Sequence, residues 1–521
     1  MSESRSIRVA AIRTGAGIAV VAAALLVLVT GGLPEVALPL GLTGMAVSFA
    51  LDPFAASFLL LVPCITLAPL PLAGLLVILS AANGFTLAIG LLLLGGLASL
   101  RPASLAAICC IVALALAGSV SDFAAIRAMP PDDWRAAAVL LLTITGAAAT
   151  ATFSPITAVY VVMRLLLDLC GTAQPLWWGL PFLLAGAGIV MMASLRGALA
   201  ELLDVAVSQV ALHQIGLAVI GIGVALCARG VDLPSVASHA LNATWLAIAC
   251  HALCRALLLR CADAVERGAG TRRLDCLGGV IHRMPVTTGA CLTGLFTIAV
   301  LPPGLGFAVF WLVFQSLVAA ARIGSFGLGL LVAAVVLVTG VSVGLAALAA
   351  MRVVMVVFLG RPRTPRAAAA DEVARPTQLI LVGLAGLLGV LGALPALALL
   401  PTFRWGDGAA AVSLLGLRIG SQTPGYAATF IAVSVASAWI ALSQVIRRPR
   451  LGRREPDWSG GFSPPPAWMP FGDPATQCGP TSFVAPIQDL IARLPSTDAA
   501  RQRLASWRDR LRRAIAARIA T

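Results

Sequence analysis

The sequence predicts an all-α protein that crosses a membrane many times. Hydrophobic residues make up 60% of its 521 residues and charged residues only 11%, whereas a soluble domain typically carries about 25% charged residues. The chain contains no lysine, and its arginines gather in a few loops and in the C-terminal tail, where they are topology signals. The net charge of +14 therefore needs no nucleic-acid partner to explain it.

We expect about fourteen membrane spans, because apolar runs long enough to cross about 30 Å of hydrocarbon recur along the whole chain. The earlier runs lie near residues 9–29, 54–70, 72–98, 103–121, 135–153, 156–170 and 176–195. The later runs lie near residues 205–228, 236–259, 287–303, 305–321, 327–357, 378–400 and 425–446.

Two of these regions are interrupted. Asn83 and Gly84 divide the run 72–98, and the sequence LPPGLGF divides the region 287–321. Prolines remove backbone donors and glycines let the chain turn, so this second region is either two spans or one discontinuous helix. The predicted hinge residues are Pro302, Pro303, Gly304 and Gly306.

Arginine placement predicts the orientation and the organisation of the chain. Short basic loops stay in the cytoplasm, so we expect both termini there and an even number of spans. We divide the chain into an N-terminal helix with an outer loop (1–53), early membrane helices (54–121), a central core (122–358), C-terminal membrane helices (359–446) and a cytoplasmic tail (447–521). Labelling Cys478 from outside intact cells should fail.

The tail ends in a predicted amphipathic helix. Thr497 or Asp498 can cap it, and apolar residues then repeat every three or four positions opposite a row of arginines. The apolar positions are Leu504, Trp507, Leu511, Ile515 and Ile519. Such a helix lies on anionic lipid or docks on a partner protein.

A few polar residues inside the spans are the candidates for chemistry, since each costs about 2.5 to 3.5 kcal/mol to insert. Arg164 and Asp168 are four residues apart, so they share a helix face and predict an ion pair. His213 lies in mid-span with Gln209 one turn before it, which suits either a hydrogen-bonded core histidine or a proton carrier.

His251 and Arg255 are also four residues apart, with His239 three turns earlier. Arg255 is close to the expected cytoplasmic end of its span and could reach the interface. We expect both side chains to face the protein interior, because a charge turned toward lipid would carry the full insertion cost.

The sequence predicts no cofactor or metal site. The eleven cysteines lie mostly in apolar stretches without CxxC spacing, which is typical of small buried hydrophobic residues. The chain also lacks a GxGxxG motif after a strand and a nucleotide-binding loop.

Several collinear motifs resemble the antiporter-like membrane subunits of complex I and of group 4 membrane-bound hydrogenases. They are HALCRALLL, GTRRLDCLGGVIHRMP and LPPGLGFAVFWLVFQSL. Within that superfamily, the chain is most similar to hydrogenase-4 component B, the formate hydrogenlyase membrane subunit. The segments LPLGLTGMAVSFALDPFAASFLLLV, AVYVVMRLLLDLCG, PDWSGGF and PTSFVAPI carry this resemblance.

The resemblance implies fourteen core helices, inverted repeats with broken helices, and proton translocation driven by redox chemistry in partner subunits. It places the chain in the bacterial inner (plasma) membrane, among other membrane and peripheral subunits of a hydrogenase-like or complex I-like assembly. The chain itself would hold no redox cofactor and catalyse no reaction alone.

The chain departs from the family at the residues that carry protons. Arg255 stands at the position of a family lysine, and Phe310 stands at that of a glutamate. The DLKR lysine aligns near Asp204, and FTLAIGLLLLGG lacks an expected acid. Because arginine keeps its proton, we expect proton conduction to be weak or absent. The alternatives are a non-conducting scaffold subunit or a component of a multi-subunit cation/proton antiporter.

Overall fold

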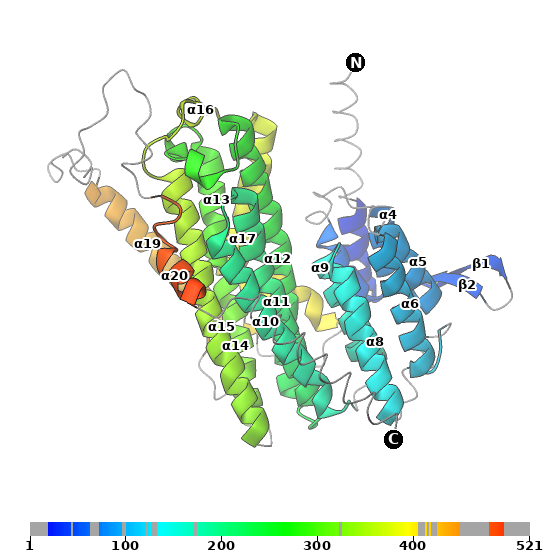
Figure 1. Ribbon diagram of the computed structural model, residues 1–521. Helices are drawn as coiled ribbons and strands as arrows, with labels where there is room; N and C mark the ends of the chain where they lie inside the picture. The colour runs from blue at the N-terminus through cyan, green and yellow to red at the C-terminus, as the bar shows by residue number, and fades with distance from the viewer. Residues whose placement is uncertain are drawn as a thin grey trace, which may run out of the picture.

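The computed structural model describes residues 19–42, 45–62, 72–95, 100–120, 123, 126, 133–170, 174–321, 326–404, 412–413, 416–417, 425–446 and 479–493. Helices dominate these residues and form two groups that stand side by side in Figure 1. The blue and cyan helices belong to the first part of the chain, and the green and yellow helices to the second.

The described part of the first group begins with an apolar helix over Ala19–Thr30, followed by a β-hairpin and further helices. β1 (Val36–Leu42) and β2 (Met45–Phe49) pair antiparallel in the region that we expect to be an outer loop. The described chain is mostly helical, as expected, and this hairpin is an addition to the all-α prediction, because backbone groups of the loop pair with one another in a two-stranded ribbon. The helices after the hairpin are α2 (Pro53–Leu59), α4 (Leu72–Leu79), α5 (Gly84–Gly95), α6 (Leu100–Ala117), α8 (Asp133–Ala151) and α9 (Pro155–Val162).

Within the run 72–98, residues 72–95 form a hairpin of two helices, divided at the interruption by Asn83 and Gly84. The chain turns between Leu79 and Gly84. A Cβ on Gly74 would lie 2.2 Å from the backbone nitrogen of Leu94, and one on Gly90 would lie 2.8 Å from that of Ile78. These close approaches show that α4 and α5 pack antiparallel, with glycine providing the room.

Helix α9 passes into a π-helical segment, η1 (Met163–Leu169). A π-helical turn changes the register of the backbone hydrogen bonds and is often found at functional sites. Side chains from outside the segment bind its carbonyls: Arg229 donates to the carbonyl of Leu167 at 2.6 Å, and Gln174 donates to that of Leu166. These bonds join the end of the first group to the second.

Two long helices form the centre of the second group. After η2 (Leu176–Trp178) come α10 (Gly179–Leu199), α11 (Leu203–Arg229) and α12 (Pro234–Ala269). In their apolar windows, 89% of α11 and 83% of α12 is buried inside the protein, against 17% of the peripheral helix over Arg375–Ala393. Buried polar groups on α11 and α12 are therefore shielded from lipid.

The break in the region 287–321 divides one discontinuous helix. α13 (Pro285–Ile298) begins at one end of the bundle. α14 (Leu305–Ala320) follows it after a turn that contains a cis bond between Pro302 and Pro303. The chain then enters α15 (Phe326–Val353) at the opposite end of the bundle (Figure 1). The two halves thus share one crossing, as one of our two alternatives predicts, although Gly306 lies inside α14.

The remaining elements complete the second part of the chain. They are η3 (Leu274–Cys276), η4 (Val280–His282), η5 (Val354–Phe358), α16 (Pro365–Ala368), α17 (Arg375–Ala393), α18 (Pro395–Leu399), η6 (Leu400–Arg404), α19 (Ala428–Ile446) and α20 (Ala485–Arg493), together with the small hairpin of β3 (Val412–Ser413) and β4 (Gly416–Leu417). One of them, α18, packs against Trp245 of α12. The predicted amphipathic helix at 497–519 and Cys478 lie outside the described residues.

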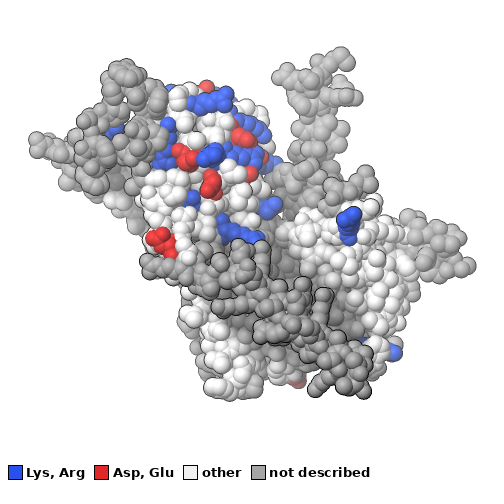
Figure 2. All heavy atoms as spheres, viewed as in Figure 1, with Lys and Arg blue, Asp and Glu red and all other residues white. Residues whose placement is uncertain are grey.

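Seven helices in the described part of the chain are long and apolar enough to cross a membrane, and shorter apolar helices accompany them. The protein is therefore a mostly helical, multi-pass membrane protein. On the face shown in Figure 2, charged side chains gather at the end of the second group that carries α16 in Figure 1.

Candidate functional site

A cluster of buried polar side chains lies halfway along the second group. His213 on α11 is fully buried, and its Nε2 lies 3.2 Å from Oγ of Ser342 on α15, which is equally buried. The Ser342 hydroxyl donates in turn to the carbonyl of Thr339 at 2.7 Å. His213 Nδ1 has no hydrogen-bond partner among the described residues.

His251 lies on the neighbouring helix and contacts α11 through its backbone. Its Nδ1 lies 2.8 Å from the carbonyl oxygen of Ala211, and only 1% of the residue is exposed. A carbonyl can only accept, so Nδ1 of His251 donates this bond. We expected His251 to face the interior, and its burial agrees with that expectation.

The break between α13 and α14 reaches the same level of the bundle. A Cβ on Gly306 would lie 2.0 Å from the carbonyl oxygen of Thr297 and 3.4 Å from Nε2 of Gln214. Gln214 is fully buried, and neither amide atom has a partner among the described residues. The hinge therefore lies against a buried amide with its full hydrogen-bonding capacity free.

Arg255 is placed differently from the expectation. It lies on α12, which continues to Ala269, so Arg255 is far from the end of its helix. The helix continues because acidic residues in its last turns bind Arg272, as described below. The side chain of Arg255 is half-buried, and no ion pair involves it in the described part of the chain.

The two histidines do not contact each other directly in the structure. They are held by different elements: His213 by α15 and His251 by the backbone of α11. His239, near the start of α12, also has a buried Nε2 without a partner among the described residues. A proton passing between these imidazoles would need an intervening carrier such as water.

Arg164 forms a second polar cluster in the first group. It is 6% exposed and bridges Asp168, at 2.8 Å, and Asp52, at 2.5 Å. The predicted Arg164–Asp168 pair is confirmed as a contact. Asp52 was not predicted as a partner, and it also caps α2 by accepting from the backbone nitrogen of Ala55 at 2.9 Å.

Aromatic rings surround the guanidinium of Arg164. Its central carbon lies 5.7 Å from the ring centre of Phe54 and 5.8 Å from that of Phe123. One turn earlier, Tyr160 packs against Phe58, which in turn packs against Trp245 of α12. This cluster holds a fixed positive charge beside two carboxylates, and its packing joins the two groups of helices.

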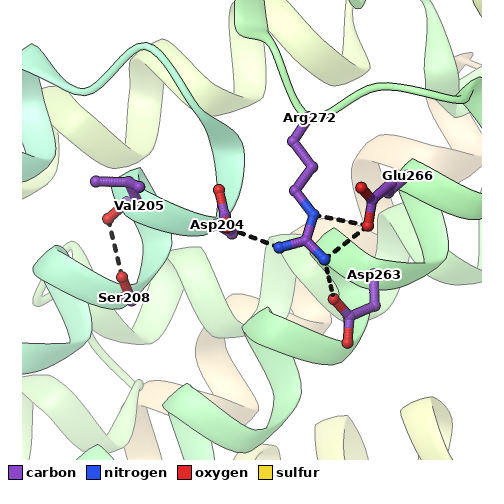
Figure 3. Close-up of polar contacts among 6 residues, drawn as sticks. All are labelled: Asp204, Val205, Ser208, Asp263, Glu266 and Arg272. Carbon is purple, nitrogen blue, oxygen red and sulfur yellow. Dashed lines mark hydrogen bonds and ion pairs between the residues drawn. The ribbon is translucent and has the colours of Figure 1, made fainter.

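A third polar cluster surrounds Arg272, close to the start of α11 (Figure 3). Its guanidinium binds Asp204 at 2.7 Å, Asp263 at 2.9 Å and Glu266 at 2.6 Å. Hydrogen bonds to Glu266 and then Asp204 raise the pKa of Arg272 further above its ordinary value. The Asp204 carboxylate connects the start of α11 to the loop after α12 through Arg272.

The loop beyond Arg272 carries one more ion pair. Arg273 binds Asp275 at 2.7 Å, and the hydrogen bond from Arg273 lowers the pKa of the Asp275 carboxyl. Both side chains are substantially exposed. This pair belongs to the surface of the loop and contributes nothing to the buried polar cluster.

Ser342, Gln214 and Asp52 were missed from the sequence as members of these clusters. Ser342 lies in GVSVG, within a very apolar helix, and a lone serine there gives no sign of its partner. Gln214 is adjacent to His213 in the sequence, whereas helical spacing favours Gln209, one turn earlier, as the neighbour of His213. No group of three histidine, cysteine or acidic residues in the described part of the chain could hold a metal ion.

No family model matches the chain. Among characterised relatives, formate hydrogenlyase subunit 3 of Escherichia coli is 31% identical over 43% of this chain and 37% of its own length. Hydrogenase-4 component B of the same species is 26% identical over 48% of this chain and 41% of its own. A Na⁺/H⁺ antiporter protein of Alkalihalophilus pseudofirmus is 31% identical over 33% of this chain and 21% of its own. The matched segments thus span less than half of each relative.

Solved structures share the fold over more of the chain. A chain of the membrane-bound sulfane sulfur reductase, an archaeal respiratory membrane complex, matches with a TM-score of 0.68 and 16% identity over 92% of this chain and 87% of its own. A chain of the Mrp complex from a Dietzia species matches with a TM-score of 0.59 and 17% identity over 77% and 92%. A chain of respiratory complex I from Thermus thermophilus matches with a TM-score of 0.55 and 17% identity over 75% and 94%.

These likenesses agree with the motifs found in the sequence. The relatives match part of the chain at the level of sequence, and the three complexes match most of it at the level of fold. Over the matched segments the chain is homologous to formate hydrogenlyase subunit 3 and hydrogenase-4 component B, and it shares its fold with chains of the three membrane complexes.

Proposed function

We propose that this chain is an integral membrane subunit of a hydrogenase-4-like or complex I-like oxidoreductase complex, with other membrane and peripheral subunits as partners. Its family role is to couple electron transfer in those partners to proton translocation. Any protons that cross this subunit pass through His213 and His251, and electron transfer takes place elsewhere in the complex.

The observation that carries this proposal is the broken helix beside buried, partner-poor polar groups. The turn between α13 and α14 lies against Gln214, next to His213 in sequence. Irregular backbone at the depth of the membrane is tolerated where it is buried in protein or lines a polar cavity. Inverted-repeat transporters place such breaks at their transport sites.

Co-purification tests the assignment to a complex. The full chain, tagged at one terminus and extracted in mild detergent, should bring down redox subunits of the hydrogenase or quinone-reductase type in fixed ratio. Isolation of the chain with cation/proton antiporter subunits alone would favour the multi-subunit antiporter instead. That alternative has support from the similarity to the Na⁺/H⁺ antiporter protein of Alkalihalophilus pseudofirmus.

A second candidate function is a scaffold that occupies its place in the complex without conducting protons. One observation supports this candidate: the buried polar side chains described around His213 and His251 include no carboxylate, and Arg255, one turn from His251, is a half-buried fixed cation. Two histidines lack the acidic and basic partners through which a change of charge spreads along a membrane subunit. Proton flux separates the two candidates.

The orientation is also a proposal. Asp232, between α11 and α12, and Arg273 lie at opposite ends of α11 and α12. We propose that the Arg273 end, where the charged side chains gather in Figure 2, faces the cytoplasm. In a background lacking other reactive cysteines, Asp232→Cys should react with an impermeant maleimide in intact cells, and Arg273→Cys should react only after lysis. The reverse pattern would invert the topology.

A further inference from the structure

Two serines on different helices lie at the level of His213. Ser342 on α15 contacts Nε2 at 3.2 Å, as described above. Ser194 on α10 is fully buried, and its hydroxyl has no hydrogen-bond partner among the described residues. A buried hydroxyl without a partner is costly, so each such group calls for an explanation.

The packing of α10 against α11 gives the level of Ser194. A Cβ on Gly197 would lie 2.4 Å from the side chain of Val210, and one on Gly216 would lie 2.6 Å from that of Val190. The two helices therefore run antiparallel in close contact. Ser194 lies between Val190 and Gly197, and His213 lies between Val210 and Gly216, so the two residues are at the same height.

The hydrogen bonds of Ser342 fix the proton on His213. The Thr339 carbonyl can only accept, so the Ser342 hydroxyl proton lies in the 2.7 Å bond to it. Oγ of Ser342 then accepts from Nε2–H of His213. In the neutral ring, Nδ1 is left with the lone pair, and this atom is buried without a partner among the described residues.

We propose that Ser342 is a positioning residue that holds His213 in the Nε2–H tautomer, and that a water molecule bridges Nδ1 of His213 and Oγ of Ser194. The water gives a partner to each of two buried atoms that otherwise have none. A proton arrives at Nδ1 from this water and leaves by the same atom. Ser342 does not carry the proton, because its own hydrogen is committed to the Thr339 carbonyl.

His251 provides an internal comparison. Its Nδ1 donates to the Ala211 carbonyl, so the neutral ring carries its lone pair on Nε2. The two buried histidines thus hold opposite tautomers, and each is fixed by a neutral acceptor. The role of His213 as a proton carrier rests on the proposed function, whereas its tautomer does not.

Solid-state NMR of the full chain with isotope-labelled histidine, in its complex and in lipid, tests the tautomers directly. The chain has only four histidines, so His213→Ala and His251→Ala assign the two buried rings. The expected result is Nε2–H for His213 and Nδ1–H for His251. Ser342→Ala should give His213 a mixture of tautomers, and Ser342→Thr, which keeps the hydroxyl, should restore the single form. Nδ1–H on His213 in the natural protein, or no change in Ser342→Ala, would overturn the proposal.

Proton uptake then tests the consequence. The difference in proton uptake per electron between the natural protein and His213→Ala is the part of the uptake that His213 carries. Ser342→Ala should lower this part by about 2-fold to 10-fold, the equivalent of one neutral hydrogen bond, and Ser342→Thr should recover it. Ser194→Ala should remove the bridging water and lower the same part while leaving the tautomer of His213 unchanged.

Two results would reject parts of the proposal separately. A Ser342-dependent tautomer with no effect of His213→Ala on uptake would leave Ser342 as a positioning residue and reject the proposed proton route. If Ser194→Ala changed the tautomer of His213 as Ser342→Ala does, Ser342 would no longer be the residue that alone fixes this tautomer.

Discussion

The cluster around Arg164 and the cluster around His213 use buried polar groups in opposite ways. Arg164 is a permanent cation held by two carboxylates, at 2.5 and 2.8 Å, and its position joins separate segments of the chain. His213 is held by a single neutral hydroxyl, and neighbouring polar atoms have no protein partner among the described residues. The first arrangement fixes structure, and the second leaves hydrogen-bonding capacity for a mobile species such as water or a proton.

Removing the cation at Arg164 should have the largest effect on stability. Arg164→Leu leaves Asp52 and Asp168 facing each other without a counter-charge, and we expect a loss of about 3 kcal/mol. This figure is at the low end for a broken buried pair because both carboxylates are partly exposed. Thermal unfolding of the purified complex measures it.

Asp168→Asn is the matched control for Arg164→Leu, since Arg164 keeps its contact with Asp52. Its loss should be clearly smaller. Equal losses in the two variants would mean that Asp52 contributes little, and the account of the cluster as a joint between segments would be wrong.

Glu372 tests a carboxylate that is held by neutral donors at the start of α13. Its carboxylate accepts from the backbone nitrogens of Val286 at 2.9 Å and Thr287 at 3.2 Å, and so caps α13. Glu372→Ala should cost about 1 to 2 kcal/mol, as expected for a lost helix cap. Thermal unfolding should show this loss, whereas Glu372→Gln, which keeps an acceptor oxygen, should show less. An unchanged melting temperature in Glu372→Ala would contradict the capping role.

Asp275 should contribute very little. The bond from Arg273 lowers the pKa of its carboxyl, so the stabilisation is present above the ordinary pKa and is lost as the pH falls through the lowered value. Both partners are exposed, and solvent screens the pair. Asp275→Asn should shift the melting temperature by less than about 1 °C at neutral pH. A larger shift would show that this loop bears on the stability of the bundle.

Replacing Gln214 should have the smallest effect on stability. The sign of the change in unfolding free energy distinguishes this cluster from the one around Arg164. The amide is buried and has no partner among the described residues. Replacing it by leucine, which has a similar volume, should leave the unfolding free energy unchanged within about 0.5 kcal/mol or raise it. A loss comparable to that of Arg164→Leu would show that Gln214 is firmly bound, and the contrast between the clusters would fail.

The sequence predicts local relations well and relations between distant segments poorly. The spacing of Arg164 and Asp168 predicts their contact, because residues four apart share a helix face. Asp52 lies 112 residues earlier, and no local pattern connects it to Arg164. The partner of His213 is equally remote, because Ser342 lies 129 positions later in the chain.

Helix boundaries differ from the expectations for reasons that are also non-local. Asn83 and Gly84 interrupt the run 72–98, and the close approach of Gly74 to Leu94 and of Gly90 to Ile78 stabilises a hairpin around this interruption. α12 extends to Ala269 because Asp263 and Glu266 form ion pairs with Arg272 on the following loop. The hinge between α13 and α14, by contrast, is predicted by its prolines, which act on the local backbone.

The central claim is that this subunit has kept a place in a proton-translocating assembly while its own proton route is reduced to two histidines. The direct test is proton uptake per electron in sealed vesicles containing the whole complex, with the natural protein, the His213→Ala and His251→Ala double variant, and Arg255→Lys. We predict a small effect of the double variant and a several-fold rise in uptake through this subunit in Arg255→Lys, because lysine releases a proton that arginine holds. A large drop in the double variant with intact electron transfer would show that the histidines are a main proton path, and would contradict the claim.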